Sequence, residues 1–210
     1  SIIEEQAGEY LLTPGTKILL NDGSLKKEMI TLQETLIEKL GSPLAIIEPG
    51  RNVRAAKAIT LVIWNTPDID SLGQEGYSLD IRKNGISITA SAPAGIFYAV
   101  QTLRQLILLS SSLNNNEEGI RLSCVSIRDK SRFNWRGVLL DPARYFLPVD
   151  LLKSYISSMA LYKMNRLQLH LTDDLGWTVE MIHYPELNIQ ENWPQTPPSR
   201  NRGMYTRQQL

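Results

Sequence analysis

Two short apolar runs, separated by a stretch with helical periodicity, constrain the fold of this chain more than any other feature. Residues 136–140 and 167–171 are each too brief for a helix, and both are typical of a strand that is buried on both faces. Between them, from Pro148, apolar residues recur at helical spacing: Leu151, Leu152, Tyr155, Ile156, Met159 and Leu161 or Tyr162. This order predicts a βαβ unit with parallel strands and a right-handed crossover.

Charged side chains directly follow both predicted strands. Arg144 comes just after the first run, and Asp173 and Asp174 come just after the second. Parallel strands place their carboxyl ends at one edge of a sheet, where ligands bind in α/β proteins, so we expect these side chains to face one cleft. An arginine offers a planar fork of donors for oxygen ligands such as sugar hydroxyls, and a carboxylate accepts hydrogen bonds or orients an acid or base.

Simpler structural interpretations stand beside these functional ones. Arg144 could form only a structural ion pair with Asp141. His170 and Asp173 resemble a metal-binding pair, but two ligands are too few for a site; we therefore favour a structural placement for His170 and predict no metal. Trp177 could stack on a sugar ring or belong to the core, and the sequence leaves both open.

Composition excludes several classes of partner. The 210 residues include 22 basic and 22 acidic side chains and are 42% hydrophobic, so no net field favours nucleic acid or an anionic membrane, and a small neutral ligand fits better. The single cysteine, Cys124, excludes an internal disulfide and is expected to pack in the core. No apolar stretch approaches the ~20 residues that span a bilayer, and residues 1–5 do not resemble a signal peptide.

Residues 1–130 are predicted to form an α+β domain, a sheet with two helices. Alternating runs and turn residues indicate the strands, and Asn-Gly between two such runs is the strongest short-range hairpin signal. The expected elements are a strand or hairpin over 9–20, a helix over 25–40 that ends at Gly41, strands over 44–47 and 59–64, a hairpin over 77–90 that turns at Asn84-Gly85, a helix over 93–109 and a strand over 120–127.

The C-terminal part beyond Trp177 carries weaker signals. Residues 193–203 contain three prolines and are predicted to be a long loop, in which Trp193 could line a sugar site. Residues 203–210 are interpreted as the start of a helix, with Thr206 as its N-cap. His183 has no partner pattern and is expected on the surface.

Several of these residues form motifs that resemble glycoside hydrolase family 20, the β-N-acetylhexosaminidases. The motifs are Leu140-Asp141-x-x-Arg144, Tyr162-Lys163-x-Asn165 and His170-Leu-Thr-Asp173-Asp174-x-Gly176-Trp177. The stretch 94–106 is similar to a helix of the non-catalytic domain that precedes the catalytic barrel in this family and in other glycosidase families. The resemblance implies an α+β accessory domain over 1–130, followed over 131–210 by the first β/α units of an incomplete (β/α)₈ TIM barrel, which needs about 250 residues to close.

The resemblance also implies an activity, the exo-acting hydrolysis of terminal N-acetylhexosamine residues by substrate-assisted retaining catalysis. It assigns Arg144 to hydroxyls of the terminal sugar and Asp173 to orienting the acid through a later histidine, with Asp174, His170 and Trp177 in supporting roles. The catalytic Asp-Glu pair of the family does not occur in the sequence. We therefore expect no catalytic residue in this chain, no cofactor, and no activity from these residues alone.

Two alternative functions fit the same residues: a non-catalytic carbohydrate-binding or scaffold protein, and another glycosidase that shares the accessory domain. The expected partner is an amino-sugar glycoside or glycan, with no nucleic acid and no membrane insertion. Exposed sides of the strands at 135–140 and 167–171 predict self-association or local disorder. The resemblance implies a periplasmic, cell-surface or secreted protein.

Overall fold

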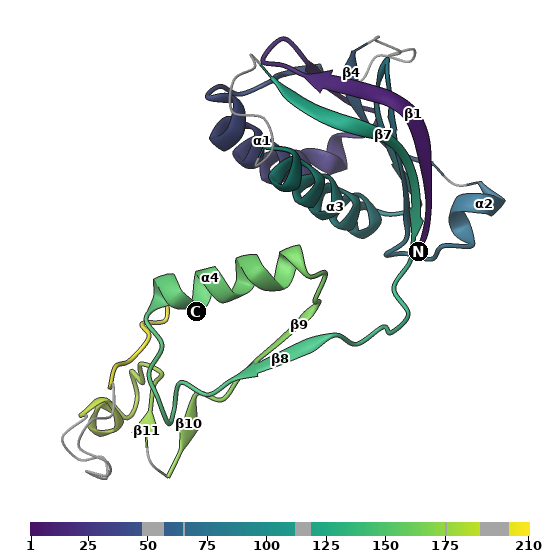
Figure 1. Cartoon of the computed structure of the whole chain (residues 1–210). Helices are drawn as coiled ribbons and strands as arrows, with labels where there is room; N and C mark the ends of the chain where they lie inside the picture. The colour runs from purple at the N-terminus through teal and green to yellow at the C-terminus, as the bar shows by residue number, and fades with distance from the viewer. Residues whose placement is uncertain (48–56, 65, 112–118, 175, 190–201) are drawn as a thin grey trace. The chain divides into compact units, whose positions relative to one another are not determined.

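Two compact units make up the chain, residues 1–132 and residues 133–210. The computed structural model describes residues 1–47, 57–64, 66–111, 119–174, 176–189 and 202–210 (Figure 1). The loops predicted after residue 48, over 110–119 and over 193–203, including Trp193, lie wholly or largely outside the described residues. Within the described part of the chain, no helix has the length and apolar content needed to cross a bilayer.

A seven-stranded mixed sheet forms the framework of the first unit, in the order β1-β7-β5-β6-β4-β2-β3. The pairs β1/β7, β7/β5 and β5/β6 are antiparallel, whereas β6/β4, β4/β2 and β2/β3 are parallel. The strands are β1 Ile2–Leu12, β2 Lys17–Leu20, β3 Ala45–Ile47, β4 Ala58–Ile63, β5 Tyr77–Arg82, β6 Gly85–Ala90 and β7 Ile120–Asp129.

Two long helices, α1 (Lys26–Leu40) and α3 (Pro93–Ser111), cover one face of this sheet (Figure 1). A 3₁₀ turn, Gly23–Leu25, leads into α1, and the short helix α2 (Pro67–Asp70) connects β4 to β5. Helix α1 ends at Gly41, whose φ of 75° lies in the left-handed region that glycine adopts without steric cost. The α+β domain with two principal helices is thus confirmed.

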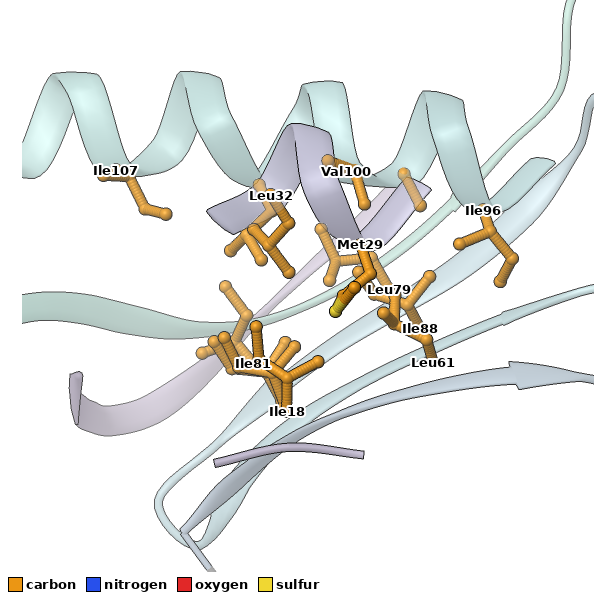
Figure 2. Close-up of a cluster of buried hydrophobic side chains, with 14 of the residues drawn as sticks. Ile18, Met29, Leu32, Leu61, Leu79, Ile81, Ile88, Ile96, Val100 and Ile107 are labelled. Atoms are coloured by element: carbon orange, nitrogen blue, oxygen red, sulfur yellow. The ribbon is translucent and has the colours of Figure 1, made fainter. Parts of the chain in front are cut away.

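The core of the first unit lies between the two helices and the sheet. Figure 2 shows apolar side chains of α1 and α3 directed toward apolar side chains of the strands. The fully buried members include Leu32, Ile96, Val100, Leu103, Ile107, Ile18, Leu61, Leu79, Ile81 and Ile88. Cys124 is also buried, as expected. Because side chains alternate along each strand, β5 and β6 place polar residues on the face away from the helices.

The predicted hairpin is present as the β5/β6 pair, but Arg82 pairs with Gly85, so the turn is Lys83-Asn84, one residue earlier than the predicted Asn84-Gly85. Gly85 has a φ of 154°, and a Cβ there would lie 2.8 Å from the carbonyl oxygen of Ala58 in the neighbouring strand β4. Only glycine combines this backbone conformation with so close an approach. The local turn signal therefore located the hairpin to within one residue.

The possible hairpin over 9–20 is wrong. A turn at residues 13–16 does occur, closed by a hydrogen bond from the Thr16 backbone N–H to the Thr13 carbonyl (2.9 Å). The strands on either side of it diverge, however, because β1 pairs with β7 at one edge of the sheet and β2 pairs with β3 and β4 near the other. Strand β1 also begins earlier than predicted, at Ile2.

Both edges of this sheet have features that interrupt regular pairing. Strand β1 carries Glu4, Glu5 and Glu9, and its register with β7 shifts between Glu5 and Glu9. Strand β3, at the opposite edge, is three residues long. Charges, irregular register and short length are the usual features of protected edge strands.

The second unit contains the predicted βαβ motif. Strand β8 (Gly137–Leu140) and strand β9 (Arg166–Leu169) are parallel, and helix α4 (Val149–Leu161) connects them. Burial of both strand faces was predicted, and that prediction is wrong: residues along β8 and β9 alternate between exposed and half-buried, and Leu139 is 55% exposed. Among the described residues of this unit, the side chains on one face of the β8/β9 pair are half-buried and those on the other face are exposed.

The hairpin β10 (Thr172–Asp173) and β11 (Gly176–Trp177) follows β9, and a 3₁₀ helix spans Pro185–Asn188. The helix predicted after Thr206 is not formed. The Thr206–Gln209 segment is a turn, in which the Gln209 backbone N–H bonds the Thr206 carbonyl (3.0 Å) and the Gln209 side chain accepts from the Thr206 N–H (2.8 Å). These two bonds involve the Thr206 backbone and not its side chain, and one turn does not make a helix. His183 is exposed, as predicted.

Candidate functional site

The carboxyl ends of β8 and β9 are joined by backbone hydrogen bonds beyond the strands themselves. The His170 N–H donates to the carbonyl of Leu140 (2.9 Å), and the Ala143 N–H donates to the carbonyl of His170 (3.0 Å). These bonds fix the start of the loop after β8 against the segment that leads into β10. The residues that follow both strands therefore share one rigid backbone frame.

Arg144 lies between two carboxylates in this frame. Its backbone N–H donates to Asp141 Oδ1 (3.0 Å), and its Nη1 donates to Asp141 Oδ2 (2.8 Å). Its Nε lies 3.2 Å from Asp173 Oδ2. The Asp173 side chain is only 10% exposed, whereas 56% of the Arg144 side chain is exposed. The guanidinium group is thus held by carboxylates on two sides and remains accessible to a ligand.

The charges of this cluster support one another. Partial burial works to raise the pKa of the Asp141 carboxyl, but hydrogen bonds from the backbone N–H and the guanidinium of Arg144, together with its positive charge, hold that pKa below its ordinary value. The hydrogen bond to Asp141, followed by the charges of Asp141 and Asp173, raises the pKa of Arg144. The contact between Asp141 and Arg144 therefore favours the charged form of both side chains.

His170 is close to the same carboxylate, with its Nε2 3.4 Å from Asp173 Oδ2. Ligand atoms of Asp141, His170 and Asp173 lie within 4.8 Å of one another, so the structure adds a third potential metal ligand to the two that the sequence indicated. The Arg144 guanidinium contacts both carboxylates, and a cation placed among them would be repelled by it. The donors fit an ion-pair network better than a metal centre.

The other two predicted residues lie in the β10/β11 hairpin. Asp174 is exposed at its turn, and its charge contributes to the raised pKa of Arg144. Trp177 is half-buried and lies opposite Thr172 in the hairpin. The buried indole Nε1 of Trp177 has no hydrogen-bond partner among the described residues. The structure brings Arg144, His170 and Asp173 together and leaves Asp174 and Trp177 beside them.

A tyrosine that the sequence analysis did not single out supports the loop that carries Arg144. Tyr205 is completely buried, its hydroxyl donates to the Leu147 carbonyl (2.6 Å), and its ring centroid lies 4.8 Å from that of Phe146. A parallel bridge between Val179 and Tyr205 fixes its backbone. A Cβ at Gly203 would collide with the Phe146 ring. Residues 203–205 therefore pack closely against the far end of the Arg144 loop.

We expect Tyr205→Phe to destabilise the second unit by about 1–2 kcal/mol, because the Leu147 carbonyl loses its donor while the aromatic ring is kept. The check is the urea midpoint, together with amide hydrogen exchange in residues 144–148. Tyr184→Phe is the matched control, since Tyr184 is 57% exposed. Equal midpoints for the two variants would show that the Tyr205 hydroxyl does not hold this loop.

A sheet-and-helix domain followed by a βαβ unit whose carboxyl edge carries an exposed arginine between carboxylates agrees with the arrangement that the resemblance to glycoside hydrolases implies. Comparison with family models agrees with this class. The model for glycosyl hydrolase family 20, domain 2, matches residues 2–130, and the model for the catalytic domain of the same family matches residues 133–210. The chain belongs to glycoside hydrolase family 20, and it comprises domain 2 and the start of the catalytic domain.

Curated relatives carry the same family activity in their names. A β-hexosaminidase of Akkermansia muciniphila is 37% identical over 171 residues, which cover 79% of this chain and 33% of the relative. A β-N-acetylhexosaminidase of Cellulomonas fimi is 41% identical over 115 residues, covering 55% of this chain and 22% of the relative. The chain thus spans about a third or less of the length of these relatives.

Solved structures extend the likeness to nearly the whole chain. The Streptomyces plicatus N-acetyl-β-hexosaminidase in complex with Thio-NAglucal matches with a TM-score of 0.79 and 31% identity, over 98% of this chain and 40% of that one. The Vibrio harveyi exo-β-N-acetylglucosaminidase in complex with N-acetylglucosamine matches with a TM-score of 0.81 and 26% identity, over 99% and 32%. Both the accessory domain and the barrel start therefore have counterparts in complete family 20 enzymes.

Proposed function

We propose that this chain is a portion of an exo-acting β-N-acetylhexosaminidase, which removes terminal N-acetylhexosamine residues from glycans by substrate-assisted retaining catalysis. Family membership and the names of the relatives support this activity. In this mechanism the 2-acetamido oxygen of the substrate attacks the anomeric carbon. A glutamate protonates the leaving oxygen, and the preceding aspartate holds the acetamide.

The observation that carries the proposal is the position of Arg144. Its guanidinium is exposed at the carboxyl edge of two parallel strands and lies 3.2 Å from Asp173. A planar fork of donors, fixed in orientation and accessible to solvent, suits the recognition of sugar hydroxyls. Arg144 thus binds hydroxyls of the terminal sugar in the proposed enzyme.

Asp173 takes a different role because it is almost entirely buried. It orients the acid through a histidine that belongs to a later part of the barrel, while His170 and Asp174 support the local charge balance. Trp177 supplies an aromatic wall beside the same edge. The acid glutamate and its preceding aspartate are not among these 210 residues, because the sequence contains no Asp-Glu dipeptide.

The two parts of the chain have separate tasks in this proposal. Residues 1–130 form the non-catalytic accessory domain, and residues 131–210 supply the first β/α units of the TIM barrel. The substrate is an amino-sugar glycoside or glycan, and the enzyme acts in the periplasm, at the cell surface or outside the cell. No step in this mechanism requires a cofactor.

The test compares the purified 210-residue chain with the complete gene product that contains it. We expect the complete protein to hydrolyse a chromogenic N-acetyl-β-glucosaminide and the chain alone to give no turnover, because the proton donor is missing from it. The matched control is a chromogenic β-glucoside, whose 2-hydroxyl cannot replace the acetamido nucleophile. Hydrolysis by the pure chain, or equal hydrolysis of both substrates by the complete protein, would contradict the proposal.

A further inference from the structure

Asp141 holds Arg144 at both ends of the arginine. One carboxylate oxygen accepts from the Arg144 backbone N–H (3.0 Å), and the other accepts from Nη1 at the tip of the side chain (2.8 Å). The first contact fixes the backbone from which the side chain departs, and the second fixes where the side chain ends. A single carboxylate thereby restrains the many rotamers that a long exposed arginine otherwise samples.

Asp141 can act in this way because its own position is determined. It follows β8 directly, and Pro142 restricts it to extended backbone. Its carbonyl accepts from the Tyr145 N–H (3.2 Å), which closes the turn around Arg144. The Asp141 carboxylate is therefore attached next to the end of β8, the strand that pairs with β9.

Asp173 alone would not fix the guanidinium plane. It approaches a different nitrogen, Nε, at 3.2 Å, and it is also 3.4 Å from His170 Nε2. A contact at Nε alone would not define the plane of the guanidinium group, and 56% of the side chain is exposed. Two carboxylates on two nitrogens define the orientation of a planar group, whereas one does not.

We propose that Asp141 is the positioning residue for Arg144: it presents the guanidinium in the one orientation that meets the hydroxyls of the terminal sugar. This role rests on the proposed function, in which Arg144 binds those hydroxyls. Asp141 touches no substrate, and it affects turnover only through the arginine. A merely structural ion pair would instead affect folding and leave substrate recognition unchanged.

The experiment is a double-mutant cycle in the complete enzyme, with kcat and KM measured on a chromogenic N-acetyl-β-glucosaminide. Asp141→Asn keeps an acceptor for the backbone N–H but removes the charge, and we expect kcat/KM to fall roughly tenfold to a hundredfold, because small misplacements of a binding group have effects of this size. In an Arg144→Ala background the same substitution should change kcat/KM less than twofold. Non-additivity of this kind identifies a residue that acts through its partner.

Two further variants complete the design. Asp141→Ser keeps a short acceptor for the turn but cannot reach the guanidinium, so it should lower kcat/KM as Asp141→Asn does. Asp80→Asn is the matched control, since Asp80 pairs with Arg82 at 3.5 Å in the accessory domain, and it should leave kcat/KM unchanged. Unfolding midpoints of all variants verify that they are folded.

The outcomes distinguish a failure of the positioning role of Asp141 from a failure of the proposed hexosaminidase function. Turnover by the parent enzyme, combined with wild-type kinetics of both Asp141 variants or with additive effects in the cycle, overturns the positioning role and leaves the proposed function standing. A parent enzyme that is folded but hydrolyses no N-acetylhexosaminide overturns the proposed function and the positioning role together.

Discussion

Replacing Arg144 by alanine in the complete enzyme is expected to lower kcat/KM for a chromogenic N-acetylglucosaminide by roughly a hundredfold to a thousandfold. The substitution removes the donors that, in the proposed function, bind the sugar hydroxyls. It also leaves Asp141 and the nearly buried Asp173 without the countercharge that both contact. The pKa of Asp141, which Arg144 holds low, should rise as a result. The expected decrease in kcat/KM therefore has two causes: the missing hydrogen bonds to the sugar and the missing positive charge beside Asp141 and Asp173.

Steady-state kinetics at several pH values measure this effect. Arg144→Lys separates charge from geometry, because lysine restores the positive charge without the planar fork, and we expect it to recover only a small part of the loss. Arg82→Ala is the control, since Arg82 is an exposed arginine paired with Asp80 in the accessory domain. A loss of less than threefold for Arg144→Ala would remove Arg144 from the substrate site.

The second large effect concerns the stability of the accessory domain. Leu103→Ala should reduce the free energy of unfolding of residues 1–132 by about 3 kcal/mol, within the range of 2–5 kcal/mol that such truncations cause in a closed core. Leu103 lies in α3 with no exposed surface, packed among the side chains between α3 and the sheet. The substitution leaves a cavity that neighbouring strands cannot fill, because each is fixed by its own pairing.

Leu109→Ala provides a control with the same substitution in the same helix. Leu109 is 68% exposed, so its truncation should change the free energy of unfolding by less than about 0.5 kcal/mol. Urea denaturation followed by circular dichroism compares the two variants. Similar midpoints would mean that α3 does not pack on the sheet through the face that contains Leu103.

The parts of the fold that could be predicted are those whose signals are local. The β5/β6 hairpin is encoded by alternation on both sides of Asn84-Gly85, and the βαβ motif by a change of period within 30 residues. Strand β1 was only partly predicted because residues 2–9 are all exposed and residues 4–8 show no alternation of apolar and polar side chains. Its pairing with β7 joins opposite ends of the domain, and no turn signal encodes such a contact.

The same distinction applies to the site. Arg144 and Asp173 could be selected from the sequence because each directly follows an apolar strand, and parallel strands bring such positions together. The sequence did not decide whether the pair of Asp141 and Arg144 is only a structural ion pair. Only the coordinates show that Asp141 contacts both the backbone N–H and the side-chain Nη1 of Arg144. The hydrogen bond of Tyr205 spans 58 residues to Leu147, and nothing near Tyr205 in the sequence indicates it.

The edges of the accessory sheet have a practical consequence for association between molecules. Edge strand β1 carries three glutamates and an irregular register, and edge strand β3 is only three residues long. Neither edge offers a second molecule a regular row of backbone hydrogen-bonding groups with which to pair. Oligomers of the 210-residue chain, if they form, should therefore grow from β8 and β9. The first 132 residues, prepared alone, should remain monomeric at the concentrations that spectroscopy requires.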